Sequence, residues 1–578
     1  MSMLCSPVIT CVYVRELPDV DKFVTSFSTH YQIIGYIVLL VYKAVSFTKF
    51  GLLHIVRSEQ FEMYAPNKRL RRQRGKDLVF SDKTENPCDE TGPIILLNTV
   101  TNHIGKPASL LKEIAFVAVV CCAQLMTQAG LAQAIAPLDI IGDSFGIQSP
   151  GELSWFAAGY SLTVGTFILI AGRLGDLYGH KKLFVLGFLW YSLWSLLAGF
   201  SVYSNRIFFD CCRAFQGLGP ALLLPNALAI FGRIYEPGRR KNFIFSLFGA
   251  TAPSGFVLGA TFSSIFSQLL WWPWSYWVMS IACLALAISG IVVIPHTPSP
   301  NKVTSVVKQI DLMGGVTGVI GLILVNFAWN QGPVVGWPTP YTYVLLIVGI
   351  LFLVLFAFIE SRAEYPLVPL QALSRDSIFV LACVGTGWSS FGIWLFYLWR
   401  FLQGLRGVTP LLASAQVAPV AISGLCAAIT TGHALAHYPP SSIMLFAMTA
   451  FTVGCILICT APVHQSYWAQ TFVSIIVMPW GMDMSFPAAT IMLSNCMPHE
   501  HQGLAASLVN TMVNYSISLG LGFAGTIESR VNDGGQDVLS GYRGAWYMGV
   551  GLSGLGVCVA AAYALHTLHQ HKGRNFKV

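Results

Sequence analysis

Long apolar runs recur along the chain from residue 114 onward, and short polar stretches separate them. Each run reaches roughly 20 residues, the length that a helix needs to cross a hydrocarbon core of about 30 Å. A helix also satisfies its own backbone hydrogen bonds in lipid, whereas a membrane β-barrel would show segments of about 10 residues with alternating polarity. The pattern therefore predicts an all-α membrane protein with about fourteen transmembrane helices, over residues 114–135, 153–172, 183–203, 207–232, 243–267, 272–294, 310–329, 341–360, 377–399, 410–431, 441–461, 467–494, 503–526 and 544–566.

Residues 1–111 follow a different pattern. The stretch "PNKRLRRQRGKDLVFSDKTENPCDETGP" is polar and is typical of a disordered cytosolic tail. The segment 31–56 is apolar but is interrupted by Lys43 and Lys49, so it is either an interfacial helix or a poor transmembrane span. No basic region precedes this segment, which argues against a cleaved signal peptide.

Composition supports the membrane assignment. The chain has 578 residues, of which 54% are hydrophobic and 10% are charged, and its mean hydropathy is +0.62. A soluble domain carries about 25% charged residues. The 14 cysteines form no CxxC pair and lie mostly inside apolar runs, where they act as small hydrophobic residues. The net charge of +8 suits loops that face an anionic lipid leaflet rather than nucleic acid.

The distribution of basic residues predicts the orientation, because cytosolic loops carry an excess of Lys and Arg. With the amino terminus inside, eleven basic residues fall in the inner loops: Arg173, Lys181, Lys182, Arg233, Arg239, Arg240, Lys241, Lys302, Lys308, Arg362 and Arg375. Five fall in the outer loops: Arg206, Arg400, Arg406, Arg530 and Arg543. We therefore expect both termini to be cytosolic.

The stretch "GRLGDLYGHKK" joins the second and third predicted spans. Its glycines allow close helix approach and a tight reversal, and its carboxylate can cap a helix or pair with a base across a helix interface. On these grounds alone it is either a conformational switch or an ordinary positive turn at the inner leaflet. The pattern Gly172, Asp176, Gly179, Lys181 and Lys182 resembles motif A of the major facilitator superfamily, which implies a cytosolic latch between two helical bundles.

Two further stretches carry the same resemblance. "RAFQGLGPALLLPNAL" is similar to motif B, through Arg213, Gln216, Gly217 and Gly219. "GATAPSGFVLGATFSS" resembles the antiporter motif C, through Gly249, Pro253, Gly255 and Gly259, although Ala260, Ser263 and Ser264 depart from its usual proline and glycines. Glycines spaced by four form a groove for a partner helix, and motif C is thought to supply such a seal and hinge.

The number of spans narrows the resemblance to the fourteen-helix drug:proton antiporters. "WGMDMSFPAATIMLSN" and "HQGLAASLVNTMVNYSISLGLGFAG" look like the fungal branch that includes aminotriazole-resistance proteins. The resemblance implies a major facilitator fold with two six-helix bundles and two inserted helices. The expected parts are an N-terminal tail over 1–111, bundles over 112–294 and 377–566, a linker with the inserted helices over 295–376, and a cytosolic C-terminal tail over 567–578.

Ionisable residues at membrane depth are costly and are functional candidates. Asp210 and Arg213 lie one turn apart in span four, as either a neutralised structural pair or a proton-coupling pair. Asp483 lies near the middle of span twelve with no base nearby in sequence. It is therefore either paired with another span or protonated part of the time, and it is the better candidate for a proton site.

Relatives carry an acid in span one where this chain has about Gln128, so proton chemistry there is doubtful. Gln124, Gln128 and Gln133 either hydrogen-bond a polar substrate or pack between helices. Gln216 in motif B is a further cavity candidate. Trp388 and Trp480 lie deep in their spans and either line the cavity or anchor helices.

The apolar spans predict a membrane protein, and the resemblance implies a secondary transporter that exports small xenobiotic or toxic solutes in exchange for protons by alternating access. An uncoupled facilitator and a transporter-like solute sensor remain as alternatives. No phosphate-binding G-x-x-x-x-G-K-[ST] loop occurs, which disfavours an ATPase. We expect a monomer in the plasma membrane, or in the vacuolar membrane, that binds lipid, protons and a small substrate. We expect no enzyme activity, cofactor, metal or nucleic-acid partner.

Overall fold

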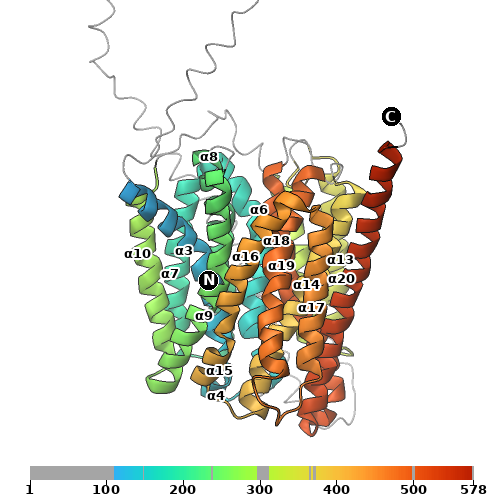
Figure 1. Cartoon of the computed structure of the whole chain (residues 1–578). Helices are drawn as coiled ribbons and strands as arrows, with labels where there is room; N and C mark the ends of the chain where they lie inside the picture. Colours follow the sequence, from blue (N-terminus) through green and yellow to red (C-terminus); the bar gives the residue numbers. More distant parts are fainter. Residues whose placement is uncertain are drawn as a thin grey trace, which may run out of the picture. The chain divides into compact units, whose positions relative to one another are not determined.

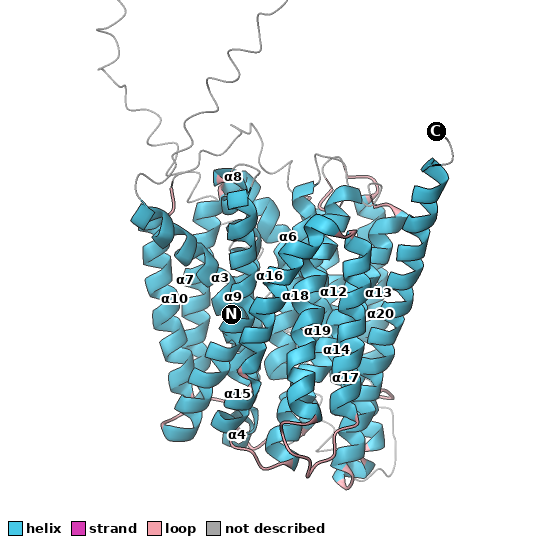
Figure 2. Cartoon of the chain, in the orientation of Figure 1, coloured by secondary structure: helices cyan, strands magenta, loops and turns pink. Residues whose placement is uncertain are grey.

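A computed structural model describes residues 110–147, 149–235, 239–295, 311–363, 366–368, 373–496 and 502–575, all within one compact unit, residues 95–578. The predicted tail up to residue 109 and the apolar segment 31–56 lie outside the described residues. Within the described residues the chain forms helices joined by loops and turns, and no strand occurs there (Figure 2). The predicted all-α class is therefore confirmed.

Fourteen spans among the described residues are long and apolar enough to cross a membrane, as the spacing of the apolar runs predicts. They contain the helices α3 (Leu110–Ile135), α6 (Trp155–Tyr178), α7 (His180–Phe200), α8 (Arg206–Ile234), α9 (Arg239–Leu269), α10 (Pro273–Val293), α12 (Leu312–Val335), α13 (Pro340–Glu360), α14 (Arg375–Arg400), α16 (Pro419–His437), α17 (Pro440–Cys459), α18 (Gln470–Cys496), α19 (Gln502–Val531) and α20 (Val538–Asn575).

Shorter helices lie beside several of these spans. They are α4 (Leu138–Ser144), α5 (Pro150–Leu153), α15 (Pro410–Val417) and the π-helical turn η4 (Phe401–Leu405). The predicted single span at 410–431 is therefore two helices, α15 and α16, with Pro419 as the first residue of the second. Proline suits this first position because it lacks the backbone N–H that a helix interior requires.

The long helices pack as two groups. Helices α3 to α10 pack among themselves, chiefly as α3 on α9, α6 on α8, and α7 on α8 and α10; we call them the N-terminal half. Helices α14 to α20 do the same, chiefly as α17 on α18 and α20, and α14 on α19 and α20; we call them the C-terminal half. The halves meet along two seams, α6 against α19 and α9 against α16.

The inserted helix α12 packs against α13, and also against α19 and α6 at the first seam. Close approach there depends on Gly165, because a Cβ atom at this position would lie 2.7 Å from the backbone nitrogen of Tyr515. The α6–α19 seam is thus a backbone-to-backbone contact, as small residues allow between membrane helices.

Two ends of the helical unit are used as reference points below. The end that carries α4 and α15 lies at the bottom of Figure 1, and we call it the Asp139 end after a residue of α4. The opposite end carries the loop between α6 and α7, and we call it the Asp176 end.

Candidate functional site

A cavity of about 430 Å³ lies between the two halves. Helices α3, α8 and α9 form its wall on the N-terminal half, and α14, α15, α16, α18 and α19 form its wall on the C-terminal half. Its lining extends to Lys241 and Thr490, which lie near the ends of α9 and α18 at the Asp176 end. The volume falls in the range of small-molecule sites.

Aromatic rings make up much of the cavity wall. They come from both halves and comprise Phe245, Phe248 and Phe256 of α9, Trp388, Phe391 and Trp394 of α14, and Phe486 of α18. The indole nitrogen of Trp388 donates to Ser485 Oγ at 3.1 Å, and that of Trp394 donates to Ser474 Oγ at 2.8 Å. These two bonds orient the rings of Trp388 and Trp394 against α18.

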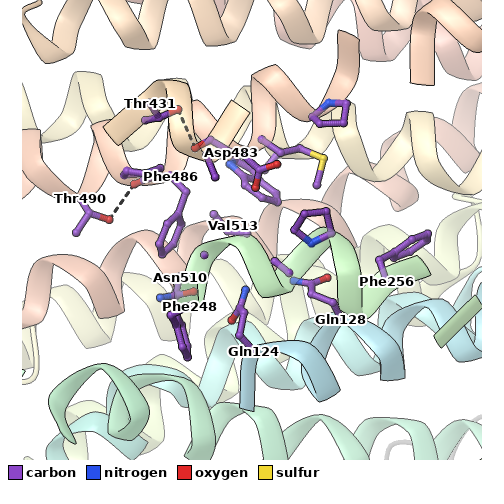
Figure 3. A pocket seen from close by; sticks show the side chains of 18 of the residues that line it. Gln124, Gln128, Phe248, Phe256, Thr431, Asp483, Phe486, Thr490, Asn510 and Val513 are labelled. Atoms are coloured by element: carbon purple, nitrogen blue, oxygen red, sulfur yellow. Dashed lines mark hydrogen bonds between the residues drawn. The ribbon is translucent and has the colours of Figure 1, made fainter. Parts of the chain in front are cut away.

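Polar side chains face one another across this apolar cavity (Figure 3). Gln124 and Gln128 project from α3, and Asn510 projects from α19 near them. Asn514 follows one turn later on α19. These amides offer both donors and acceptors, so they can hydrogen-bond a polar or neutral solute.

Asp483 of α18 is the acidic residue among the side chains that line the cavity. Its Oδ2 atom is buried and has no hydrogen-bond partner among the described residues. A Cβ atom at Gly424 would lie 2.7 Å from this oxygen, and Pro253 packs on the same glycine. Because Gly424 of α16 has no side chain, it leaves room for the Asp483 carboxylate near Pro253 of the other half.

The basic residue among the cavity-lining side chains is Lys241. Its Nζ donates to the Gly232 carbonyl at 3.3 Å and lies 5.8 Å from the centre of the Phe245 ring. Lys241 thus has other partners at the mouth of the cavity, and no ion pair of Asp483 occurs among the described residues.

Arg213 lies in the core of the N-terminal half and is fully buried. It hydrogen-bonds Gln216, and it donates to the carbonyls of Phe156 and Gly130 at 2.9 Å each. Its guanidinium also lies 4.7 Å from the Tyr160 ring centre, which adds a cation–π contact. Arg213 therefore holds α8 against α3 and α6, and Gln216 holds it against α7 by donating to Ser195 Oγ at 2.7 Å. Neither residue lines the cavity.

The predicted partnership of Asp210 with Arg213 does not form as a direct contact. Asp210 pairs with Arg206 at 3.4 Å, and Arg206 also contacts Glu152 at 2.5 Å. The reason is geometric: Arg213 turns toward the carbonyls of α3 and α6, while Asp210 turns toward the first turn of its own helix. Asp210 does not line the cavity.

Two other predicted cavity residues also lie elsewhere. Gln133 is buried and donates to Ser275 Oγ at 3.2 Å, which ties α3 to α10. Trp480 packs against Phe446 of α17, with ring centres 6.3 Å apart. Of the residues that the sequence suggested for the cavity, Gln124, Gln128 and Trp388 line it, and Gln133, Gln216 and Trp480 do not.

The motif at Gly172 to Lys182 makes most of its described contacts within the N-terminal half. Asp176 is exposed and lies 3.3 Å from Arg233 and 3.4 Å from His180. Lys181 donates to the Ile291 and Ile294 carbonyls at the end of α10. Gly179 has a φ of +98°, which explains why a glycine stands at this reversal.

Two motif residues bear on the seam and the surface. A Cβ atom at Gly172 would lie 3.4 Å from Ser507 Oγ of α19, so this glycine lies at the seam with the other half. Lys182 is exposed. The ion pairs of Asp176 remain on one side of that seam, so this structure does not join the halves through Asp176.

The glycines of the antiporter-like motif in α9 have two roles in the structure. A Cβ atom at Gly255 or Gly259 would overlap the backbone of Leu125 or Ala129, so this face of α9 packs tightly on α3. Gly249 and Pro253 instead line the cavity. The groove predicted from the glycine spacing thus receives α3, a helix of the same half.

Sequence reasoning missed Asn510, Asn514 and most of the aromatic wall. The two asparagines stand one turn apart in an otherwise apolar run, and this spacing is a signal for a polar face. Aromatic residues gave no such signal, because 13% of the chain is aromatic and most rings in it face other helices or lipid.

Comparison with known proteins gives the class. The model of the Major Facilitator Superfamily matches residues 117–462 and 378–577. A peptide transporter, crystallised in complex with sulfate, has the same fold with a TM-score of 0.59 at 12% identity, covering 82% of this chain and 98% of that one. The chain belongs to the Major Facilitator Superfamily of membrane transporters, and the predicted fold is confirmed.

Three fungal relatives are similar over most of their length. A low affinity ammonium transporter of Saccharomyces cerevisiae is 72% identical over 472 residues, 81% of this chain and 92% of that protein. The efflux pump terJ of Aspergillus terreus is 52% identical over 80% of this chain and 90% of that protein. The aminotriazole resistance protein of Saccharomyces cerevisiae is 41% identical over 79% and 84%. The predicted drug-efflux-like branch is thereby confirmed.

Proposed function

We propose that this transporter exports small, weakly basic solutes across the membrane in exchange for protons, and that Asp483 is the site where the two meet. The observation that carries the proposal is a carboxylate without a described ion-pair partner in a cavity between the two halves. An isolated ionised carboxylate is costly away from water. The carboxyl group therefore needs either a bound proton or a bound cation.

The cavity wall suits a cationic or protonated nitrogen. Aromatic faces attract cations, and Trp388 and Phe486 come from the same half as Asp483. The amides of Gln124, Gln128 and Asn510 offer hydrogen bonds that do not depend on charge. A solute such as an aminotriazole, which combines a flat ring with basic nitrogens, matches both features. The efflux and resistance names of two relatives support this substrate class.

Exchange follows from alternating exposure of one site. The cavity reaches the Asp176 end, where a proton or a solute can enter or leave. When the halves rock about the fixed site, the same carboxylate faces the other side. With the predicted orientation, the Asp176 end faces the cytosol, and export means loading the solute there and returning with a proton. We propose the plasma membrane as its location, with the vacuolar membrane as the alternative.

A second candidate is low-affinity transport of ammonium, favoured by the 72% identity to a transporter of that name. Ammonium is a cation, so it would use the same carboxylate. It could also contact the aromatic faces as a cation, but it is small and would leave most of the cavity of about 430 Å³ unfilled. An uncoupled facilitator or a solute sensor of the same fold would have the same cavity but would not respond to a proton gradient.

Proteoliposomes with an imposed pH gradient distinguish these functions. Accumulation of labelled aminotriazole, methylammonium and tetramethylammonium would be measured; the last is permanently charged and cannot cross lipid as a neutral base. Protein-free liposomes give the passive distribution of the weak bases. Wild-type protein is expected to concentrate at least one probe, whereas a facilitator would only equilibrate it and a sensor would move none. Preference for methylammonium over aminotriazole would favour the ammonium function.

The central variant is Asp483→Asn, which keeps the shape of the side chain and removes the carboxyl group that can bind and release a proton. It should abolish gradient-driven accumulation while downhill exchange stays detectable. Asp210→Asn tests the rival proton site. Asp311→Asn is the matched control, because Asp311 lies outside the cavity lining, it caps α12 through the Gly314 N–H at 2.8 Å, and asparagine caps equally well. If Asp483→Asn still concentrates solute, the proton site lies elsewhere.

A further inference from the structure

The two halves are joined at the Asp139 end by an ion pair. Arg400, the last residue of α14, hydrogen-bonds Asp139 of α4. The neighbouring Gln403 donates from Nε2 to the Ala136 carbonyl at 2.7 Å. The other ion pairs given for the described residues, such as Arg206 with Glu152, lie within the N-terminal half. The Arg400–Asp139 pair therefore crosses between the halves.

A local change of helix type places both side chains at the crossing. Directly after Arg400, residues Phe401–Leu405 form a π-helical turn, closed by a hydrogen bond of 3.1 Å from the Arg406 N–H to the Phe401 carbonyl. π-Helical turns are rare and frequently mark functional sites. Here the wider turn ends α14 just where Arg400 and Gln403 reach the other half.

Arg400 also has an acidic neighbour in its own half. Glu528 of α19 and Tyr542 of α20 both interact electrostatically with Arg400. Glu528 is 3% exposed, and Asn532 donates to its Oε1 at 2.9 Å. No ion pair of Glu528 within 4 Å occurs among the described residues. Arg400 is therefore ion-paired with a carboxylate of the other half, while a second, buried carboxylate of its own half acts on it electrostatically from beyond ion-pair distance.

We propose that Arg400 is a charge switch that pairs with Asp139 while the Asp139 end is closed and with Glu528 when that end opens. Opening separates the halves and takes Asp139 away. A guanidinium is always charged in proteins, and leaving it partly buried without a counterion would be costly. Glu528 moves with Arg400, because both belong to the C-terminal half, and it supplies the replacement partner.

The proposed switch makes a prediction that differs from that of an ion pair which only holds the closed state together. Asp139 stabilises the closed state and Glu528 stabilises the open state, so removing the two carboxylates should shift the equilibrium in opposite directions. Arg400 is in this sense a positioning residue for the transport cycle, and its action does not depend on which solute occupies the cavity. The inference therefore stands or falls separately from the proposed substrate and from Asp483.

Hydrogen–deuterium exchange of the full chain in lipid nanodiscs tests the switch. Exchange at residues 133–147 and 401–412 reports transient opening of the Asp139 end, because amides there exchange from the open state. Asp139→Asn should raise this exchange roughly tenfold, as expected when one partly buried ion pair is lost from the closed state. Arg400→Gln removes the partner of both carboxylates, so it should change this exchange by less than Asp139→Asn does. Glu528→Gln should lower it by about threefold or more.

Arg406→Gln is the matched control. Arg406 lies six residues from Arg400 and bonds Thr471 and Pro462 at 3.0 Å, within the C-terminal half alone. Hydrogen–deuterium exchange at residues 133–147 in the Arg406→Gln variant should match that of the wild type. If Arg400→Gln fails to fold, Asp139→Asn and Glu528→Gln still decide the matter. Increased exchange in Glu528→Gln, or unchanged exchange in Asp139→Asn, would overturn the switch.

Discussion

The two ends of this transporter pair their charges differently. At the Asp139 end, Arg400 pairs with Asp139 across the two halves. At the Asp176 end, Asp176 pairs with Arg233 and His180, both on its own half. The cavity lining extends toward the second end. We interpret the end held by a cross-half ion pair as the closed one. At the other end, the described ion pairs of Asp176 do not reach the C-terminal half.

The sidedness of the two ends gives the largest expected effect, because labelling is all or none. A cysteine placed at exposed Gln536 should react with a membrane-impermeant thiol reagent from outside intact cells. A cysteine at exposed Lys182 should react only after the cytosolic face is made accessible. The unmodified chain gives the background from its native thiols. Labelling of position 536 only from the cytosol would reverse the assignment of the ends.

Charge reversal at the closed end should have the next largest effect. Asp139→Arg places two guanidiniums opposite each other, and like charges in contact cost several kcal/mol. Transport should fall by about a hundredfold or more, since two to three kcal/mol in an equilibrium already correspond to such factors. Adding Arg400→Asp should restore closure of that end, measured by hydrogen–deuterium exchange. A double variant as open as Asp139→Arg would contradict a direct pair.

At the other end, Asp176→Asn should reduce the transport rate by about tenfold with little loss of folded protein. The carboxylate is exposed, so its removal should cost little stability, while any contact it makes with the C-terminal half during the cycle is lost. Arg233→Gln sharpens the test, because it removes one of the two partners of Asp176 on the same half and leaves His180 as the other. Arg233→Gln should therefore favour closure of the Asp176 end. Normal transport rates in folded Asp176→Asn protein would remove the latch from the cycle.

The smallest effect is expected from a neutral contact across the second seam. Ser264 of α9 and Ser414 of α15 hydrogen-bond at 2.8 Å near the Asp139 end. Ser264→Ala removes this one neutral hydrogen bond, worth about 1 kcal/mol, and leaves the bond from Ser414 to the Ala260 carbonyl in place, so exchange at residues 401–412 should rise by no more than about fivefold. Ser267→Ala is the control, because Ser267 bonds only the Ser264 carbonyl of its own helix at 3.2 Å. An effect as large as that of Asp139→Asn would mean that the ion pair of Asp139 with Arg400 is not what closes this end.

Most of the fold follows from the sequence, because a helix that crosses lipid must be long and apolar and each such run is visible on its own. The candidate site was harder. Gln124 and Gln128 stand four residues apart and share a helix face, but Gln133 is five residues further and points about 140° away, since each residue advances a helix by about 100°. This calculation of side-chain direction needs only the sequence, and it could have shown that Gln133 points away from Gln124 and Gln128.

Contacts between distant parts of the chain could not be predicted in this way. Asp139 and Arg400 are 261 residues apart, and their meeting depends on how two bundles close. Arg213 had an acid one turn away in sequence, yet the structure gives it the carbonyls of Gly130 and Phe156 instead. Packing decides which neighbour a buried charge contacts, and the spacing of residues along the sequence does not reveal that packing.

The size of the cavity has a consequence for hydration. A volume of about 430 Å³ has room for more than ten water molecules at roughly 30 Å³ each. An ion as small as ammonium would fill a minor part of it and keep much of its hydration shell, and each conformational cycle would carry that water along. A flat aromatic solute would displace the water instead. The same cavity would thus hold a small ion together with its hydration water, and it would bind a ring compound directly against its wall.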